Sequence, residues 1–122
     1  MLQPNLPDSR HWRFQLDLEG IGWLTIDTPR APVNTLGRET IAELEALVQR
    51  FEEMIAAGEL KGIVLQSAKD SGFIAGADIS EFDDMAEPDI LTRALSRTHT
   101  LFSRIEGLKV PVVATIHGFC LG

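Results

Sequence analysis

The chain has 122 residues, with 18 acidic against 11 basic side chains and a formal net charge of −7. This balance argues against sequence-independent nucleic-acid binding, which needs a basic surface. The hydrophobic fraction of 44% excludes disorder for the whole chain, and no apolar run approaches the roughly 20 residues of a membrane span. A single cysteine, Cys120, excludes an internal disulfide framework. We therefore expect a soluble cytoplasmic protein.

The first structured element is expected at residue 12. Residues 1–11 are polar, contain prolines and show no periodicity, so they are expected to form a flexible tail. Apolar and polar residues then alternate over 12–18, which predicts a half-buried strand, and Glu19-Gly20 predicts a turn into a second strand over 22–26. These two strands are expected to form an antiparallel hairpin. The apolar positions of the first strand are Trp12, Phe14, Leu16 and Leu18.

A loop and a long helix follow the hairpin. Residues 27–37 contain two prolines and a glycine, which predicts a loop. Apolar residues recur at helical spacing over 38–57, and Gly58 is placed to end the helix. The positions of this apolar stripe are Ile41, Leu44, Leu47, Val48, Phe51, Met54 and Ile55.

The second half of the chain predicts a parallel sheet. Residues 62–66 form a short apolar run after the helix, which is typical of a strand buried on both faces. A glycine turn over 67–77 and a helix from Pro88 to Gly107 come next, followed by a buried strand over 110–116. The helix stripe is Leu91, Ala94, Leu95, Thr98, Phe102 and Ile105. The order β-β-α-β-(short α)-α-β defines an α/β chain, and a further helix is expected to cover the last strand.

The first glycine turn has two readings. Asp78 followed by Glu81 is a capping-box pattern, so these side chains can simply cap a short helix. The functional reading concerns the backbone before them: Gly76 permits a tight turn, and the N–H of Ala77 then lies near a helix N-terminus. Such a donor can stabilise an oxyanion.

The second glycine turn, His117 to Gly122, follows the last strand and is also open to two readings. Glycines after a strand serve the topology more often than the chemistry, although two such turns can aim N–H groups at one negative charge. His117 is read as a packed or hydrogen-bonded loop histidine rather than a catalytic one. Cys120 is expected to be a small buried side chain.

The loop Thr28–Leu36 is polar and stiffened by proline. Asn34 is placed to fix this loop through hydrogen bonds from its side chain to the backbone. Arg30 and Lys69 could contact a phosphate, although scattered surface cations are usually only solvated. The chain has no P-loop, G-x-G-x-x-G, G-x-S-x-G or metal-ligand spacing, and its histidines at 11, 99 and 117 are dispersed.

These motifs together resemble the crotonase (enoyl-CoA hydratase/isomerase) superfamily. The resemblance runs from about residue 13 to the end and is carried by Phe73-Ile-Ala-Gly-Ala-Asp-Ile79 with Ile116-His-Gly-Phe-Cys-Leu-Gly122, supported by Val33-Asn-Thr-Leu36. Within the superfamily, the chain is most similar to the N-terminal hydratase part of bacterial fatty-acid oxidation complex α subunits. The resemblance implies the N-terminal part of a ββα spiral, so residues 12–122 are expected to be a partial domain.

The resemblance also implies a site and a reaction. It implies an acyl-CoA substrate whose thioester oxygen accepts hydrogen bonds from the N–H of Ala77 and of the residue after Gly122. It implies that two glutamates beyond residue 122 move the proton during hydration of a 2-enoyl thioester, so the chain alone is expected to be inactive. No metal or cofactor is implied, and NAD is expected only for a fused dehydrogenase domain. The implied substrate-binding residues are Ala31, Pro32, Val33, Ala75, Gly76, Asp78, Ile79, Ser80 and Gly122.

The resemblance implies assembly as a homo-oligomer or with a thiolase. Two alternatives remain open on the sequence. Isomerases and thioester hydrolases of the same superfamily share the oxyanion motif, and a non-catalytic assembly module could keep the fold.

Overall fold

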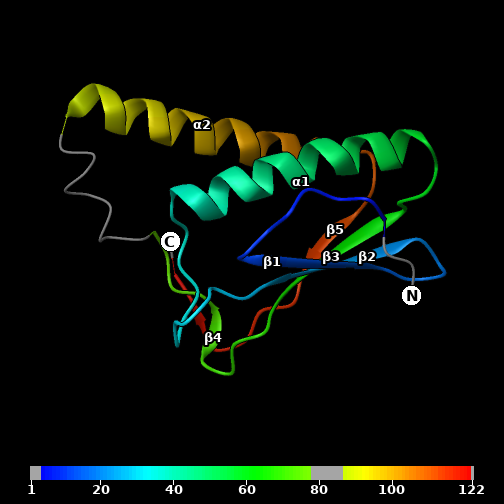
Figure 1. Cartoon of the computed structure of the whole chain (residues 1–122), viewed down its shortest axis with the longest axis horizontal. Helices are drawn as coiled ribbons and strands as arrows, with labels where there is room; N and C mark the ends of the chain where they lie inside the picture. The colour runs from blue at the N-terminus through cyan, green and yellow to red at the C-terminus, as the bar shows by residue number, and fades with distance from the viewer. Residues whose placement is uncertain (1–3, 78–86, 122) are drawn as a thin grey trace.

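The computed structural model in Figure 1 has a four-stranded sheet with two long helices on one face and a two-stranded sheet at one end. It describes residues 4–77 and 87–121. The strands are β1 (Trp12–Leu16), β2 (Ile21–Ile26), β3 (Gly62–Ser67), β4 (Gly72–Ile74), β5 (Val112–Ala114) and β6 (Phe119–Cys120), and the helices are α1 (Arg38–Ala56) and α2 (Pro88–Glu106).

The large sheet has the strand order β1-β2-β3-β5. β1 and β2 are antiparallel, with Trp12 opposite Ile26, which confirms the predicted hairpin. β2 pairs with β3, and β3 with β5, in parallel, which confirms the predicted parallel pairing. The predicted burial of β3 on both faces is wrong, because both helices lie on one face and β3 is only half-buried from Val64 onward. Parallel neighbours need a connection over one face of the sheet, and α1 and α2 are those connections.

The core lies between this sheet and α1. Alternation along β1 and β2 directs one set of side chains toward the helix, and the ring of Phe14 lies 4.7 Å from that of Phe51 on α1, centroid to centroid. The predicted helix over 38–57 is confirmed to within one residue, and Gly58 follows it with φ of +75°, as expected for a helix-ending glycine. The buried residues of α1 are Thr40, Ile41, Leu44, Leu47, Val48, Phe51 and Met54.

The predicted extension of the first strand to Leu18 is wrong, because β1 ends at Leu16 and Leu18 is 84% exposed. Asp17 explains the early end. Its carboxylate accepts hydrogen bonds from the Trp23 indole and from the backbone N–H of Ile21 and Glu19, which closes a tight turn. The hydrogen bond from Trp23, followed by that from Ile21, lowers the pKa of Asp17 below its ordinary value.

Helix α2 is confirmed in extent, but most of its predicted apolar stripe does not reach the core. Leu101, which was not predicted, is its one buried residue. Two ion pairs join the helices: Arg97 to Glu45 at 2.8 Å, and Arg104 to Glu52. The hydrogen bond from Arg97 lowers the pKa of Glu45. Exposed apolar residues on α2 are Ile90, Leu91, Leu95 and Phe102.

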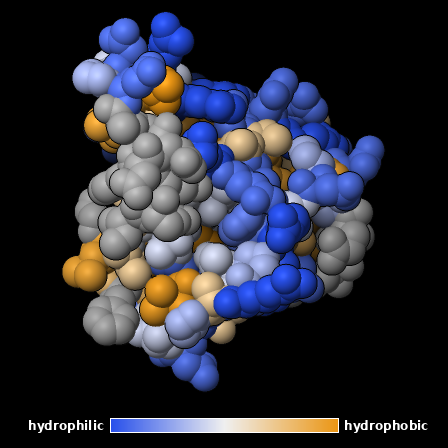
Figure 2. All heavy atoms as spheres, turned by 60° about the vertical axis from the view of Figure 1, so that its left-hand side comes forward, coloured by the Kyte–Doolittle hydropathy of each residue, from blue (hydrophilic) through white to orange (hydrophobic). Residues whose placement is uncertain are grey.

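The strand predicted over 110–116 is present, but its predicted burial and length are wrong. Strand β5 covers only Val112–Ala114 and forms an exposed edge of the sheet. Val113 is 56% exposed and Ile116 is 59% exposed. Figure 2, which brings the left-hand side of Figure 1 forward, shows further hydrophobic residues, coloured orange, at the surface among hydrophilic ones.

The N-terminal segment from residue 4 to 11, expected as a flexible tail, contacts α1. Glu43 accepts hydrogen bonds from the backbone N–H of Arg10 and of His11, and its carboxylate lies 2.6 Å from Nδ1 of His11. Possible metal-ligand atoms of His11, Glu39 and Glu43 lie within 4.8 Å of one another. Arg10 pairs with Glu39 at 3.1 Å, so the carboxylates of this cluster already have cationic or N–H partners.

Gly22 offers a test of this packing. A Cβ on Gly22 would lie 2.5 Å from the Phe14 ring and 2.9 Å from Leu60. We expect Gly22→Ala to displace that ring and to lower the free energy of unfolding by about 1–3 kcal/mol, as for other overpacked cores. Urea denaturation of the two proteins measures this difference.

The matched control is Gly62→Ala in the adjacent strand, where the new Cβ would meet the end of the flexible Ile21 side chain at 3.2 Å. We expect this variant to change the unfolding free energy by less than about 0.5 kcal/mol. Equal effects of the two substitutions would contradict the proposed packing constraint at Gly22.

Candidate active site

The structure brings the two glycine turns together. β4, in the first turn, pairs in parallel with β6, in the second, and the Leu121 N–H donates to the Ile74 carbonyl at 2.9 Å. Gly118 has φ of +57°, and a Cβ there would collide with the Ser71 carbonyl oxygen. Sequence reading missed both strands, because strands of three and two residues carry no usable periodicity.

The loop before α1 also lies beside the first glycine turn. The Ala75 N–H donates to the Asn34 carbonyl at 2.8 Å, and the Leu36 N–H donates to the Gly76 carbonyl at 2.8 Å. Leu36 and Ala77 form a parallel β-bridge. Residues 34–36 and 75–77 therefore run side by side, although they are about 40 positions apart in the sequence.

This pairing fixes the direction of the Ala77 N–H. The Gly76 carbonyl and the Ala77 N–H belong to one planar trans peptide group, so they point in opposite directions. Because the carbonyl points at Leu36, the Ala77 N–H points away from residues 34–36. Gly76 has φ of +109°, a conformation that glycine adopts without the strain of a side chain. Among the backbone hydrogen bonds of residues 4–77 and 87–121, none is donated by the Ala77 N–H.

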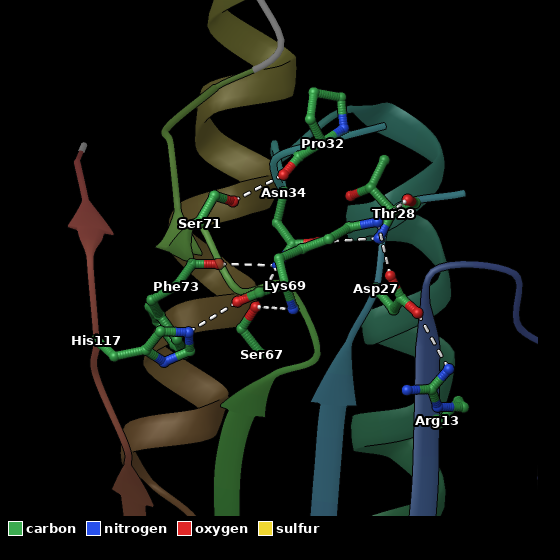
Figure 3. A network of polar contacts seen from close by, with 10 residues as sticks. All are labelled: Arg13, Asp27, Thr28, Pro32, Asn34, Ser67, Lys69, Ser71, Phe73 and His117. Atoms are coloured by element: carbon green, nitrogen blue, oxygen red, sulfur yellow. Dashed lines mark hydrogen bonds and ion pairs between the residues drawn. The ribbon is translucent and has the colours of Figure 1, made fainter. Parts of the chain in front are cut away.

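Asn34 joins the loop to its surroundings, as Figure 3 shows. Its Oδ1 accepts the Thr28 N–H at 2.9 Å, and its Nδ2 donates to Ser67 Oγ at 2.8 Å and to the Phe73 carbonyl at 2.9 Å. The residue is only 1% exposed. The expectation that Asn34 fixes the loop is confirmed, and Ser67 and Phe73 are partners that the sequence did not indicate.

Lys69 does not face solvent as a phosphate ligand, which corrects one sequence expectation. Its Nζ lies 2.7 Å from Asp27 Oδ1 and donates to the Thr28 carbonyl at 2.8 Å. Asp27 also pairs with Arg13 at 3.1 Å. The hydrogen bond from Lys69, aided by the charges of Lys69 and Arg13, lowers the pKa of Asp27 although burial opposes this shift. Arg30, the other candidate, is exposed.

His117 has a structural partner. Its Nε2 lies 2.8 Å from the Lys69 carbonyl, and because a carbonyl only accepts, Nε2 is the donor. The prediction of a hydrogen-bonded loop histidine is confirmed. Cys120, expected to be buried, is exposed, since it lies in the last short strand at the open end of the small sheet.

The other predicted site residues divide into two groups. Ala31 and Val33 are half-buried and Pro32 is exposed, in the loop whose Pro32 carbonyl accepts the Ser71 hydroxyl at 2.7 Å. This contact places 31–33 beside the first glycine turn. The predicted site residues Asp78, Ile79, Ser80 and Gly122 lie outside the described residues. The predicted helix cap formed by Asp78 and Glu81 also lies outside them.

The fold is that of the crotonase class. Residues 17–122 match the enoyl-CoA hydratase/isomerase family, and the chain belongs to this family. An enoyl-CoA hydratase from Mycobacterium smegmatis superposes with a TM-score of 0.79 at 24% identity, covering 90% of this chain and 41% of that one. An enoyl-CoA hydratase/isomerase family protein from Hyphomonas neptunium gives 0.78 at 27% identity, covering 93% and 42%.

Two curated relatives are each named fatty acid oxidation complex subunit alpha. The protein from Shewanella amazonensis is 46% identical over 107 residues, which are 85% of this chain and 14% of that protein. The protein from Aliivibrio fischeri is 40% identical over 106 residues, covering 87% and 15%. The chain thus spans about one seventh of the length of these relatives. No described helix has the length and apolarity needed to cross a membrane.

The ion pair between Lys69 and Asp27 predicts a pH dependence of stability. A carboxyl whose pKa is lower in the folded than in the unfolded state stabilises the fold above its unfolded pKa. That contribution is lost as the pH falls through the folded pKa, so Asp27 contributes to the loss of stability below about pH 4. We expect Lys69→Met to flatten the fall in unfolding free energy between neutral pH and pH 3, measured by urea denaturation.

Arg10→Met is the matched control, because it removes one cation from an exposed ion pair. In Arg10→Met, the pH dependence of the unfolding free energy is expected to stay closer to that of the unsubstituted protein than it does in Lys69→Met. Identical pH profiles for the two variants would mean that Lys69 does not hold the pKa of Asp27 down.

Proposed function

We propose that this chain forms the thioester-oxygen side of the active site of a longer acyl-CoA enzyme that adds water to 2-enoyl-CoA thioesters. The observation that supports the proposal is the Gly76–Ala77 peptide group, whose carbonyl is bound to Leu36 and whose N–H points away from that support. Membership of the enoyl-CoA hydratase/isomerase family agrees with this reaction. The name fatty acid oxidation complex subunit alpha on the curated relatives agrees with a role in fatty-acid β-oxidation.

The proposed reaction explains why an N–H donor is needed. The oxygen of water bonds to C3 of the enoyl group, the electrons of the C2–C3 double bond move toward the thioester, and an enolate oxygen carries the negative charge. A preoriented N–H stabilises that oxygen in the transition state more than in the substrate. In this proposal Ala77 supplies one donor, and the residue after Gly122 supplies the second.

The loop residues Ala31–Val33 and the segment Ala75–Ser80 are proposed to bind the CoA moiety. Proton transfer to C2 is assigned to glutamates outside this chain. Adding water changes no net oxidation state, so NAD is proposed only for a fused dehydrogenase. A cytoplasmic location, and assembly as a homo-oligomer or with a thiolase, are further parts of the proposal.

Turnover with crotonyl-CoA tests the proposal. We expect the full-length protein containing this chain to hydrate crotonyl-CoA, measured as loss of the ultraviolet absorbance of the conjugated thioester. The purified 122-residue chain should hydrate it no faster than buffer, because the proton-transferring carboxylates are assigned elsewhere. A folded full-length protein that binds the thioester without turnover would favour the non-catalytic module, and saturable turnover by the chain alone would contradict the assignment of those carboxylates.

A proline substitution tests the Ala77 donor itself. Ala77→Pro removes the N–H while Gly76 keeps its carbonyl for Leu36. We expect kcat in the full-length protein to fall by about 10²–10³-fold, the usual effect of removing one oxyanion donor. Ala77→Ser, which keeps the N–H, is the control and should retain most of the activity. Comparable losses in the two variants would exclude a role for this donor.

A further inference from the structure

We propose that the buried side-chain amide of Asn34 is a positioning residue that sets the orientation of the Gly76–Ala77 peptide group and hence the aim of the Ala77 N–H. This inference rests on the proposed function and adds a residue that controls the donor without touching the substrate. Asn34 and Ala77 lie in different loops, Asn34 before helix α1 in the sequence and Ala77 after it.

The first step is that the donor segment has little support of its own. β4 is paired with the two-residue strand β6 and is not part of the four-stranded sheet. After Ile74 the chain leaves even this pairing, and its described backbone partners at 75–77 are residues 34–36. The orientation of the Gly76–Ala77 peptide group therefore depends on where residues 34–36 are held.

The second step is that residues 34–36 lie in a loop that itself needs an anchor. The loop between β2 and α1 contains two prolines and belongs to neither sheet. Asn34 supplies the anchor, because its side chain contacts three separate segments: the loop start at Thr28, the end of β3 at Ser67, and β4 at Phe73. Through Ser67 the anchor reaches the four-stranded sheet, the most extensively paired part of the molecule.

The third step is that the anchor is fully satisfied and buried. Both N–H bonds of the Asn34 amide and its Oδ1 have partners at 2.8–2.9 Å, and its main-chain carbonyl holds the Ala75 N–H. At 1% exposure, water cannot replace a lost partner. Removing one partner would leave a buried polar group unpaired, and the local structure would shift to relieve it.

The substitution Asn34→Asp separates this role from simple packing. An aspartate keeps the size of the side chain and an oxygen for the Thr28 N–H, and the Ser67 hydroxyl can rotate to donate to it. The Phe73 carbonyl, however, loses its N–H donor and faces a carboxylate oxygen instead. The change therefore acts on β4, two residues before Ala75, while conserving the volume of the site.

Two controls match this variant. Val48→Ala removes buried volume on α1, at a residue 1% exposed and remote from the turn, and reports loss of stability alone. Ser71→Ala removes an exposed hydrogen bond to the Pro32 carbonyl, which joins the same two segments at a different point. A further variant, Ser67→Ala, removes one of the two acceptors of the Asn34 amide and should give an intermediate effect.

The experiment measures two quantities in the full-length protein, at a temperature where all variants are folded. Hydrogen exchange of a peptide containing Leu36 reports the Leu36–Gly76 hydrogen bond, and we expect about tenfold faster exchange in Asn34→Asp but not in Val48→Ala or Ser71→Ala. Hydration of crotonyl-CoA reports the donor, and we expect kcat to fall about tenfold or more with KM changed by less than about threefold.

The outcomes distinguish this inference from the proposed function. The positioning role is overturned if the peptide containing Leu36 exchanges hydrogen at the same rate in Asn34→Asp as in the unsubstituted protein. It is also overturned if Asn34→Asp and Val48→Ala, compared at equal loss of Tm, lose the same amount of kcat. If exchange at Leu36 accelerates as expected but the unsubstituted full-length protein hydrates no enoyl thioester, the positioning stands and the proposed reaction fails. If Asn34→Asp does not fold, Ser67→Ala carries the same comparison, with the same two readouts and the same controls.

Discussion

The hydrogen bond from the Leu36 N–H to the Gly76 carbonyl is the contact on which the candidate site depends. A backbone donor has no rotamer of its own, so its direction is set by the plane of its peptide group. A hydrogen bond to the carbonyl of the same peptide group fixes that plane, and the carbonyl points away from the N–H. In this chain the loop before α1 binds the carbonyl of Gly76, and the donor of Ala77 is left pointing outward.

The rest of the fold holds the two segments that form this hydrogen bond. Helix α1 packs on the sheet through a continuous apolar core, and the loop that precedes it enters from the end of β2. The ion pair of Lys69 with Asp27 and the hydrogen bond of His117 to the Lys69 carbonyl hold the other side of the same region. Lys69 and Asp27 therefore support the backbone of this region through their contacts with each other and with Thr28.

The sequence predicted the parts of the fold that carry a long periodic signal. The hairpin and helix α1 have apolar residues at regular spacing, β3 follows them as a short apolar run, and the structure has all three where they were expected. The errors occur where burial depends on distant partners. Leu91, Leu95 and Phe102 of α2 and Val113 of β5 lie in apolar patterns typical of core elements, yet their side chains are exposed. Periodicity identifies a face that can be buried, but not what buries it.

The candidate site was predictable in a similar, partial way. Glycines and small residues around Gly76 indicate a backbone site, and Asn34 is a residue type that fixes loops. The partners of Asn34 could not be read from the sequence, because Ser67 and Phe73 are more than 30 positions away and are brought near by strand pairing. The roles of Lys69 and Cys120 were misjudged for the same reason, since their surroundings come from other segments.

In a site made from backbone groups, the substitutions that reduce activity most are expected at residues that orient the donor peptide group. Any side chain at position 77 except proline keeps the N–H, so the identity of the donor residue matters less than the orientation of its peptide group. Orientation is controlled by side chains that bind the supporting loop, and Asn34 is the buried one among them. A site of this kind tolerates replacement of most side chains around it, provided that a few buried anchors continue to hold its peptide planes.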